Sequence, residues 1–146
     1  MSGQRLILLA EDSRDDAFLL RRAFMAAGVS CAIIDVRNGQ QAINYLNGDP
    51  LYADRATFPI PHLVILDLKM PLVDGFEVLK WLKTQPTLKS VPVVVLSSSN
   101  LETDREKART LGAQDYLVKP NDPKELVKVA QKLQERWLDA KNASAS

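Results

Sequence analysis

The stretch HLVILDL, residues 62–68, decides the fold class because it is the most apolar run of the chain. Its aliphatic residues are continuous rather than alternating with polar ones, which is typical of a strand buried on both faces of a parallel sheet. We therefore predict that this run forms the central strand of a sheet. It also carries Asp67, and a carboxylate among leucine, valine and isoleucine is costly unless it is paired or bound to a metal.

Strand-like and helix-like patterns alternate on both sides of this run, which predicts a doubly wound α/β domain around a parallel sheet. The other strands are expected at residues 5–10 (RLILLA), 30–36 (SCAIIDV), 92–96 (PVVVL) and 115–118 (DYLV). The helices are expected at residues 14–27, 40–46, 76–85, 101–112 and 123–137. Five strands, each followed by a helix, predict a (βα)5 domain.

Caps and turns predict where the helices begin and end. Ser13 and Asp122 are expected to be N-caps, and Gly28 stops the first helix. Asn38-Gly39 predicts a turn before the second helix. The longest stretch without a periodic pattern is DPLYADRATFPIP, residues 49–61, which we interpret as an ordered surface loop because it holds three prolines.

Composition and charge are those of one ordinary globular domain, with 146 residues and a formal net charge of +1. This charge gives no electrostatic reason to bind nucleic acid or an anionic membrane. No apolar run approaches transmembrane length, and the N-terminal run is too short for a signal peptide. We expect residues 1–140 to form the domain and residues 141–146 (KNASAS) to be a disordered polar tail.

The single cysteine, Cys31, lies in an apolar run and has no second cysteine with which to form an internal disulfide. We expect it to be a buried thiol in a reducing compartment. Together with the missing signal peptide, this predicts a cytoplasmic location.

Polar side chains stand at the ends of four of the expected strands: Glu11 and Asp12, Asp67, Ser97 and Lys119. Because all strands of a parallel sheet point the same way, their carboxyl ends share one edge, where open α/β sheets bind ligands. The sequence therefore predicts that three carboxylates, a hydroxyl and an ammonium meet there. This is the chemistry of a divalent metal beside a phosphoryl group.

The metal that suits these residues is Mg²⁺, because the side chains offer only oxygen ligands and a hard cation relieves the repulsion among carboxylates. No cluster of histidine and cysteine favours zinc. His62 is the only histidine, and we interpret it as a surface or packing residue at the start of a strand.

Each of these residues alone has a simpler explanation. Glu11 and Asp12 would favour the N-terminus of the next helix, Ser97 would suit a turn, and Lys119 would be a solvated lysine. At a shared edge, however, Lys119 would balance the acids and form an ion pair with Asp67 when no phosphoryl group is bound. The Lys119–Pro120 bond is also a candidate for the cis form.

Four features in this order resemble the receiver domain of two-component response regulators: the acidic pair Glu11-Asp12, the aspartate in VILDLKMPLVDG, the hydroxyl after PVVVL, and the segment GAQDYLVKP. The resemblance covers about residues 5–139. It implies a flavodoxin-like three-layer sandwich whose five parallel strands have the order 2-1-3-4-5.

The resemblance also implies a role for each residue at the edge. Asp67 would be the phosphoacceptor and form an acyl phosphate. Asp12 and Asp67 would hold Mg²⁺, with Glu11 acting through water and the backbone carbonyl of Lys69 as a further ligand. Lys119 would contact a phosphoryl oxygen. Such a protein catalyses only its own phosphorylation and dephosphorylation.

The same resemblance implies a switch and two partners. Ser97 would hydrogen-bond the phosphoryl group, and Tyr116 would be the aromatic residue that turns inward when the hydroxyl moves. A histidine kinase would supply the phosphoryl group, and a downstream protein would bind the face formed by the fourth helix, the fifth strand and the last helix. Dimerisation through this face is an alternative use of it.

One subgroup is more similar to this chain than others: the single-domain regulators paired with bacterial and cyanobacterial phytochromes. The proline-containing loop, the VPVVVLSSS strand and the absence of an output domain support this narrower resemblance, which implies a bacteriophytochrome as the kinase. The chain departs from many receivers in having Ser97 for threonine, Glu11 for aspartate and Lys69 at a position that is often small or polar.

Other functions remain open at this point. A phosphatase of the haloacid-dehalogenase type would need an acid where Lys69 stands, and a flavin-binding domain would need a phosphate loop where EDSRDD lies. A receiver that binds partners without phosphorylation, or one that passes the phosphoryl group on in a relay, is also compatible with these residues.

Overall fold

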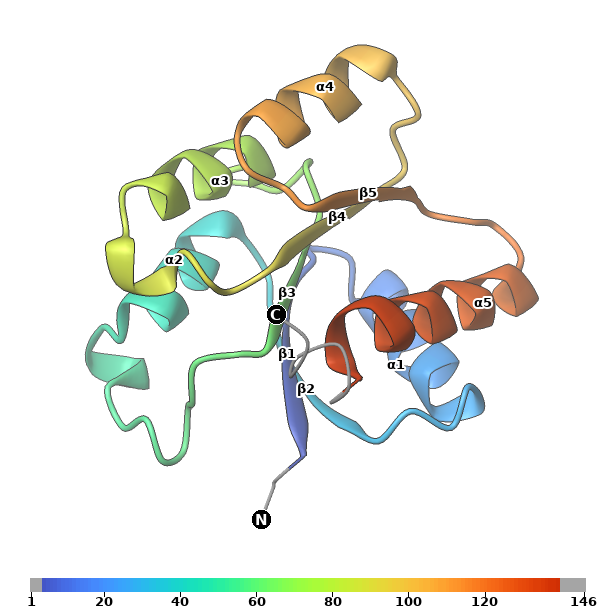
Figure 1. The fold of residues 1–146 in the computed structure, drawn as a ribbon, viewed down its shortest axis with the longest axis horizontal. Helices are drawn as coiled ribbons and strands as arrows, with labels where there is room; N and C mark the ends of the chain where they lie inside the picture. Colours follow the sequence, from blue (N-terminus) through green and yellow to red (C-terminus); the bar gives the residue numbers. More distant parts are fainter. Residues whose placement is uncertain (1–3, 140–146) are drawn as a thin grey trace.

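The computed structural model describes residues 4–139, and the expected tail at residues 141–146 lies outside this range. A five-stranded parallel sheet runs through the middle of the molecule in the order β2-β1-β3-β4-β5 (Figure 1). Its strands are β1 (Arg5–Ala10), β2 (Cys31–Val36), β3 (Leu63–Leu66), β4 (Val93–Ser97) and β5 (Asp115–Val118). The predicted fold class and strand order are confirmed.

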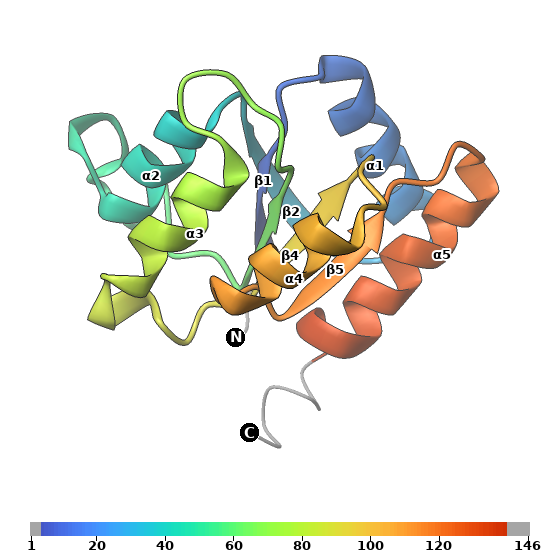
Figure 2. The same cartoon turned by 90° about the horizontal axis from the view of Figure 1, so that it is seen from above.

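Helices cover both faces of the sheet and make three layers (Figures 1 and 2). One face is covered by α1 (Arg14–Ala26) and α5 (Pro123–Leu133), and the other by α2 (Gly39–Asn47), α3 (Gly75–Lys83) and α4 (Glu102–Thr110). Shorter helical turns are η1 (Pro50–Tyr52), η2 (Pro86–Leu88) and η3 (Gln134–Leu138), the last of which extends α5. No helix in residues 4–139 is long and apolar enough to cross a membrane.

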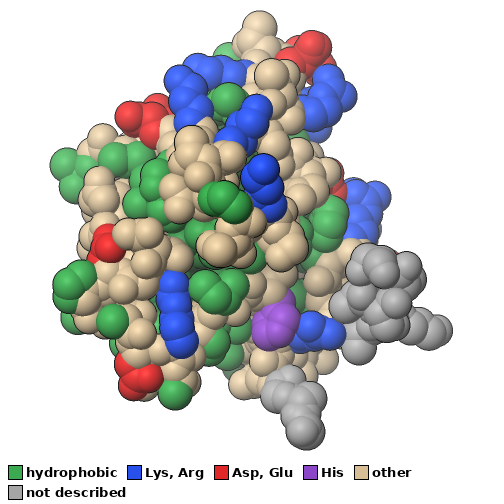
Figure 3. Space-filling view, turned by 60° about the vertical axis from the view of Figure 1, so that its left-hand side comes forward, with side chains coloured by type: hydrophobic (Ala, Val, Ile, Leu, Met, Phe, Trp, Pro, Cys, Tyr) green, Lys and Arg blue, Asp and Glu red, His purple; other side chains and the backbone are tan. Residues whose placement is uncertain are grey.

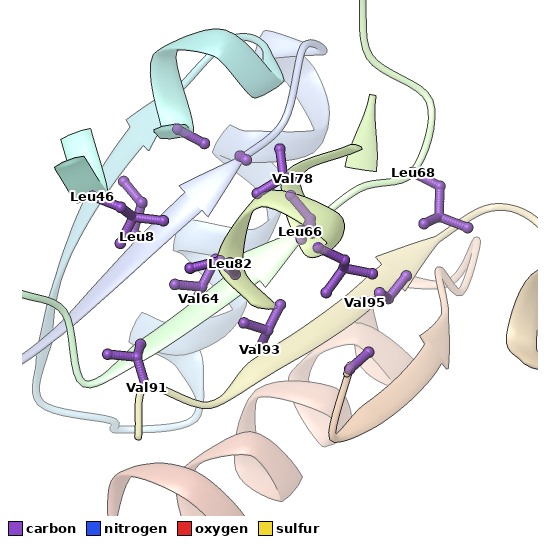
Figure 4. Close-up of a cluster of buried hydrophobic side chains, with 14 of the residues drawn as sticks. Leu8, Leu46, Val64, Leu66, Leu68, Val78, Leu82, Val91, Val93 and Val95 are labelled. Atoms are coloured by element: carbon purple, nitrogen blue, oxygen red, sulfur yellow. The ribbon is translucent and has the colours of Figure 1, made fainter. Parts of the chain in front are cut away.

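The core lies on both sides of the sheet, and β3 contributes to each side. Val64 and Leu66 pack toward α2 and α3, against residues such as Leu46 and Leu82 (Figure 4). Ile65 points to the opposite layer, which α1 and α5 cover. Every residue of β3 is buried, as predicted for a central strand that has helices on both of its faces.

Local capping explains why the helices begin where they do. The Ser13 side chain accepts a hydrogen bond from the backbone N–H of Asp16, and the predicted N-cap is confirmed. Asp122 caps α5 as predicted. The predicted turn at Asn38-Gly39 is wrong: Asn38 is the N-cap of α2, and its side chain accepts from the N–H of Gln41. An asparagine carbonyl satisfies a free N–H at a helix start as readily as it forms a turn.

The long loop between α2 and β3 is ordered, as expected, and one arginine holds it. The Arg55 guanidinium donates to the backbone carbonyls of Tyr45, Leu46 and Phe58. The rings of Tyr52 and Phe58 pack against Tyr45, with ring centroids 5.0 and 6.0 Å away. Tyr45 and Leu46 lie in the last turn of α2, so the arginine adds hydrogen bonds to carbonyls at the end of this helix.

The single cysteine and the single histidine both lie at the edge of the sheet where the strands start. Cys31 is half-buried rather than buried as expected, because β2 is an edge strand with incomplete cover. Burial raises the pKa of its thiol. His62 is exposed (Figure 3), and its Nδ1 accepts a hydrogen bond from the backbone N–H of Leu6 at 3.0 Å. Neither residue is near the opposite edge, where the strands end.

Candidate functional site

The structure brings an ammonium and three carboxylates together at the carboxyl edge of the sheet. Lys119, which follows β5, places its Nζ 2.7 Å from Glu11 Oε1, at the end of β1. The same Nζ lies 3.0 Å from Oδ2 of Asp67, directly after β3, and 2.9 Å from Oδ2 of Asp16 in the first turn of α1. Residues from three separate parts of the chain therefore share one ion-pair network.

Backbone hydrogen bonds from neighbouring strands fix the residues of this network. The three members that follow a strand donate their backbone N–H to a carbonyl at the end of the adjacent strand: Glu11 to Val36 at 3.0 Å, Asp67 to Ala10 at 3.1 Å, and Lys119 to Ser97 at 2.8 Å. The sheet ladder thus continues one residue beyond each strand. These bonds hold the main chain in place and so fix the positions from which the side chains converge.

A group of oxygen atoms suited to a metal ion lies beside the lysine. Carboxylate oxygens of Glu11, Asp12 and Asp67 all lie within 4.8 Å of one another. Glu11 and Asp67 are buried, with exposed fractions of 3% and 7%, whereas Asp12 is exposed. The site is partly open to solvent and offers only oxygen atoms as metal ligands. Mg²⁺ keeps several bound waters in sites of this kind. The donor set fits the predicted cation.

The charges at this edge are not balanced without a cation. Burial raises the pKa of Glu11 to about 7, with the charge of Asp67 adding to this effect and the hydrogen bond from Lys119 opposing it. Burial alone would lower the pKa of Lys119, but hydrogen bonds to Glu11 and Asp16 and the charge of Asp67 raise it above its ordinary value. These effects favour the charged form of Lys119 and make Glu11 easier to protonate than an ordinary glutamate.

We expect the affinity for Mg²⁺ to increase with pH. Because a carboxylate must lose its proton before it binds a metal, a Glu11 pKa of about 7 predicts a Kd that falls roughly tenfold from about pH 6 to about pH 8. Titration calorimetry at several pH values measures this. Glu11→Gln should bind more weakly and show a flatter pH dependence, and an equally steep dependence in this variant would contradict the assignment.

The same pKa has a consequence for stability in the absence of metal. The folded pKa of about 7 lies above the ordinary value of 4.5, so between these values the folded protein holds a proton that the unfolded chain has released. The contribution of Glu11 to stability is therefore complete below about pH 4.5 and decreases as the pH rises to about 7.

A cavity of about 170 Å³ opens beside the network. Glu11, Asp16, Asp67 and Lys119 line its polar side, and Ser98 also contributes to the wall. Its remaining lining is largely leucine and isoleucine from the sheet and from α1 and α5. The charged groups therefore face a small space at the surface rather than the closed interior.

Among the described residues, the predicted switch residues share no hydrogen bond with Asp67 but are connected to each other through Ser99. Ser97 is fully buried, and its Oγ accepts a hydrogen bond from the backbone N–H of Ser99 at 3.2 Å. The buried Tyr116 donates its hydroxyl to the carbonyl of Ser99 at 2.8 Å, and Arg105 lies over its ring at 4.8 Å. Ser99 thus links the two residues, and Tyr116 occupies an inward position.

Lys69 and Pro120 lie close in sequence to Asp67 and Lys119, the two residues that form the central ion pair. Lys69 is exposed, and its backbone N–H donates to Asp67 Oδ1 at 3.4 Å. The suggestion that Lys119–Pro120 is cis is wrong, since residues 4–139 contain no cis peptide bond. The trans form is the more stable one for most X-Pro bonds, and the three carboxylates suffice to orient the lysine.

Asp16 is absent from the site residues predicted from the sequence. The signal for its role was available, because α1 starts only a few residues after β1 ends and its first turn must lie at the same edge. The N-cap Ser13 fixes this turn through the N–H of Asp16 at 3.1 Å. The direction of the Asp16 side chain, however, depends on how α1 crosses the sheet.

Comparison with known proteins gives a consistent result. The sequence model of the response regulator receiver domain family matches residues 7–131. Over 135 residues the chain is 36% identical to the response regulator Rcp1 of Synechocystis sp., covering 92% of this chain and 90% of Rcp1. Over 133 residues it is 35% identical to the probable methanogenesis regulatory protein FilR2 of Methanothrix harundinacea, covering 91% of this chain and 83% of FilR2.

Solved structures are similar over nearly the whole chain. The phosphorylated cyanobacterial phytochrome response regulator RcpA superposes with a TM-score of 0.85 at 35% identity, covering 94% of this chain and 96% of RcpA. The Mn²⁺-bound form of Rcp1 superposes with a TM-score of 0.81 at 36% identity, covering 92% and 95% of the two chains.

Proposed function

This chain belongs to the response regulator receiver domain family, and we propose that its Asp67 accepts a phosphoryl group from the phosphohistidine of a histidine kinase. As a receiver it is a signalling protein of two-component systems rather than an enzyme in the ordinary sense. The observation that carries the proposal is the position of Lys119 Nζ, 3.0 Å from Asp67 Oδ2, at an edge where Glu11 and Asp12 add further oxygen donors.

In the proposed transfer, an Asp67 oxygen attacks the phosphorus atom and forms an acyl phosphate. The bond from phosphorus to the imidazole nitrogen breaks, and its electron pair stays on the imidazole. Such a reaction needs positioning and charge neutralisation more than covalent help from the protein. Lys119 serves both needs, because its ammonium is held beside Asp67 and can donate to a phosphoryl oxygen.

The residues that would hold Mg²⁺ are Glu11, Asp12 and Asp67, together with the backbone carbonyl of Lys69. When bound, the ion would neutralise charge on the phosphoryl oxygens. The proximity of the three carboxylates supports this assignment, because it concentrates negative charge that a cation would neutralise. The pKa of Glu11 is raised mainly by burial, and the charge of Asp67 adds to this effect. The likeness to Rcp1, whose structure has been solved in a Mn²⁺-bound form, supports it further.

Intact mass after incubation with Mg²⁺ and acetyl phosphate tests this proposal on wild type and Asp67→Asn. We expect wild type alone to gain the mass of one phosphoryl group. An equal gain in both proteins would mean that another residue is the acceptor. If wild type gained nothing from acetyl phosphate or from phosphoramidate, whose P–N bond resembles that of phosphohistidine, the proposal would be wrong.

We propose that the phosphoryl group is sensed through Ser97 and Tyr116. The added group brings about −1.5 to −2 charges next to the end of β4, enough to bias a loop with two arrangements. Ser99 bonds to both residues, so a movement of the Ser97 hydroxyl would reach Tyr116 directly. The face of α4, β5 and α5 would then bind a downstream protein or a second copy of the chain.

The proposed kinase is a phytochrome-type histidine kinase. This rests on the similarity to RcpA, described as a cyanobacterial phytochrome response regulator, at a TM-score of 0.85. Transfer from the phosphorylated kinase to this chain, compared with an unrelated phosphorylated kinase, tests the pairing. Equal transfer rates from both kinases would count against it.

Lys69→Ala is expected to shorten the lifetime of the acyl phosphate by about threefold to tenfold. Lys69 follows Asp67 by two residues and is exposed, so its flexible ammonium can cover the phosphoryl group and hinder the attacking water. Loss of phosphoryl mass over time, after the donor is removed, measures the rate. Lys80→Ala, an exposed lysine on α3, is the control, and equal lifetimes in all three proteins would contradict the prediction.

A further inference from the structure

We propose that Asp16 is a further residue of this site and competes with the phosphoryl group for Lys119, so that it slows the phosphorylation of Asp67. The inference rests on the proposed function. It assigns to Asp16 a role in setting the rate, without direct contact with the phosphorus atom.

The hydrogen-bonding capacity of Lys119 is fully used in this network. An ammonium has three N–H donors, and Lys119 has three carboxylate partners: Glu11 at 2.7 Å, Asp16 at 2.9 Å and Asp67 at 3.0 Å. Only 17% of the lysine side chain is exposed, so it has little freedom to leave this position. A phosphoryl oxygen therefore gains a bond from Lys119 only when one of these carboxylates gives up its own.

The three carboxylates differ in how readily they give up the lysine. Asp67 becomes an acyl phosphate, which removes its carboxylate charge. Glu11 belongs to the group of oxygen atoms suited to a metal ion, and a cation there attracts it away from the lysine. Asp16 lies outside that group, and nothing in the reaction removes its charge. It keeps one donor of Lys119 occupied and presents a negative charge to an incoming phosphate.

The backbone around Asp16 holds it in this position. Its N–H donates to the side chain of the N-cap Ser13, which fixes the first turn of α1 at the carboxyl edge of the sheet. A simpler explanation is that Asp16 only complements the helix dipole. Asp15 distinguishes the two explanations, because it carries the same charge in the same turn but is not among the three ion-pair partners of Lys119.

The experiment measures the second-order rate constant for phosphorylation of the full chain by acetyl phosphate, with Mg²⁺ in excess and constant ionic strength. We expect Asp16→Asn to increase this constant by about fivefold, the effect of one nearby charge in a partly solvated site. Asp15→Asn should stay within about twofold of wild type. The gain in Asp16→Asn should be larger with dianionic acetyl phosphate than with monoanionic phosphoramidate, a difference that a purely structural role would not produce.

The outcomes separate this inference from the function on which it rests. A rate for Asp16→Asn equal to or below that of wild type would overturn the inference, as would an equal gain in Asp15→Asn. In either case phosphorylation of wild type would leave the proposed function standing. If wild type itself took up no phosphoryl group, both would fail. Urea denaturation of each variant shows whether it is folded under the assay conditions.

Discussion

Lys119→Met is expected to slow the phosphorylation of Asp67 by about a hundredfold or more, which is the usual effect of removing one preorganised donor from developing negative charge. The structure supports a value at this level because the ammonium is already held 3.0 Å from Asp67 before any phosphate arrives. Burial alone would lower its pKa, but its carboxylate partners raise the pKa above the ordinary value and so favour the charged ammonium. Methionine keeps much of the side-chain volume and removes the charge.

The binding of Mg²⁺ should change in the opposite direction. Without the lysine, Glu11, Asp16 and Asp67 lose the cation that all three share, so a bound divalent ion would relieve more repulsion than in wild type. We therefore expect Lys119→Met to bind Mg²⁺ at least as tightly as wild type while it is phosphorylated far more slowly. The time course of intact mass and a calorimetric titration measure the two quantities.

A matched control for this variant lies at the start of α5. Lys124 is exposed and lies a few residues after Lys119 in the sequence. Lys124→Met therefore removes the same charge without touching the ion-pair network. It should be phosphorylated at the wild-type rate. If Lys119→Met also kept the wild-type rate, the lysine would be a structural counter-ion only. Loss of both activity and Mg²⁺ binding would instead indicate that the site had unfolded.

The sequence predicted the sheet because hydrophobic runs and turns are local signals. The continuous run around β3 is typical of a strand with cover on both faces, and in a parallel sheet the polar residues after it are expected at the carboxyl edge. The strand order came from the resemblance to receivers and is confirmed. By contrast, Asn38-Gly39 was ambiguous, because the same two residues suit a turn and a helix start.

The side-chain contacts were harder to predict than the backbone. Asp16 and Asp15 are indistinguishable in sequence, yet only Asp16 is an ion-pair partner of Lys119 in the network, because the direction of each side chain depends on how α1 lies on the sheet. The link from Ser97 through Ser99 to Tyr116 depends on the path of the loop after β4. That path is set by tertiary packing and has no periodic signal in the sequence.

Gly75→Ala is expected to destabilise the fold by about 3 kcal/mol, at the upper end of the effect of overpacking a close-packed region. A Cβ at this first residue of α3 would collide with the backbone carbonyl oxygen of Asp67 and lie 2.9 Å from Leu68 Cα. Neither neighbour is a flexible side chain that can move aside. The backbone N–H of Gly75 also donates to the Leu68 carbonyl at 3.0 Å, which holds the two segments together.

Urea denaturation of Gly75→Ala and Gly28→Ala separates this collision from the general cost of replacing a glycine. Gly28 has a φ of +74° and nothing within 4 Å of an added Cβ, so its replacement should cost only about 1 kcal/mol of left-handed strain. Equal losses in the two variants would contradict the steric argument.

Because relief of the collision must displace the backbone that carries Asp67, Gly75→Ala should also be phosphorylated more slowly, by about tenfold or more, under conditions in which it remains folded. Gly28→Ala, at the far end of α1, should keep the wild-type rate, so the two variants together test whether the close approach of α3 to β3 positions the phosphoacceptor.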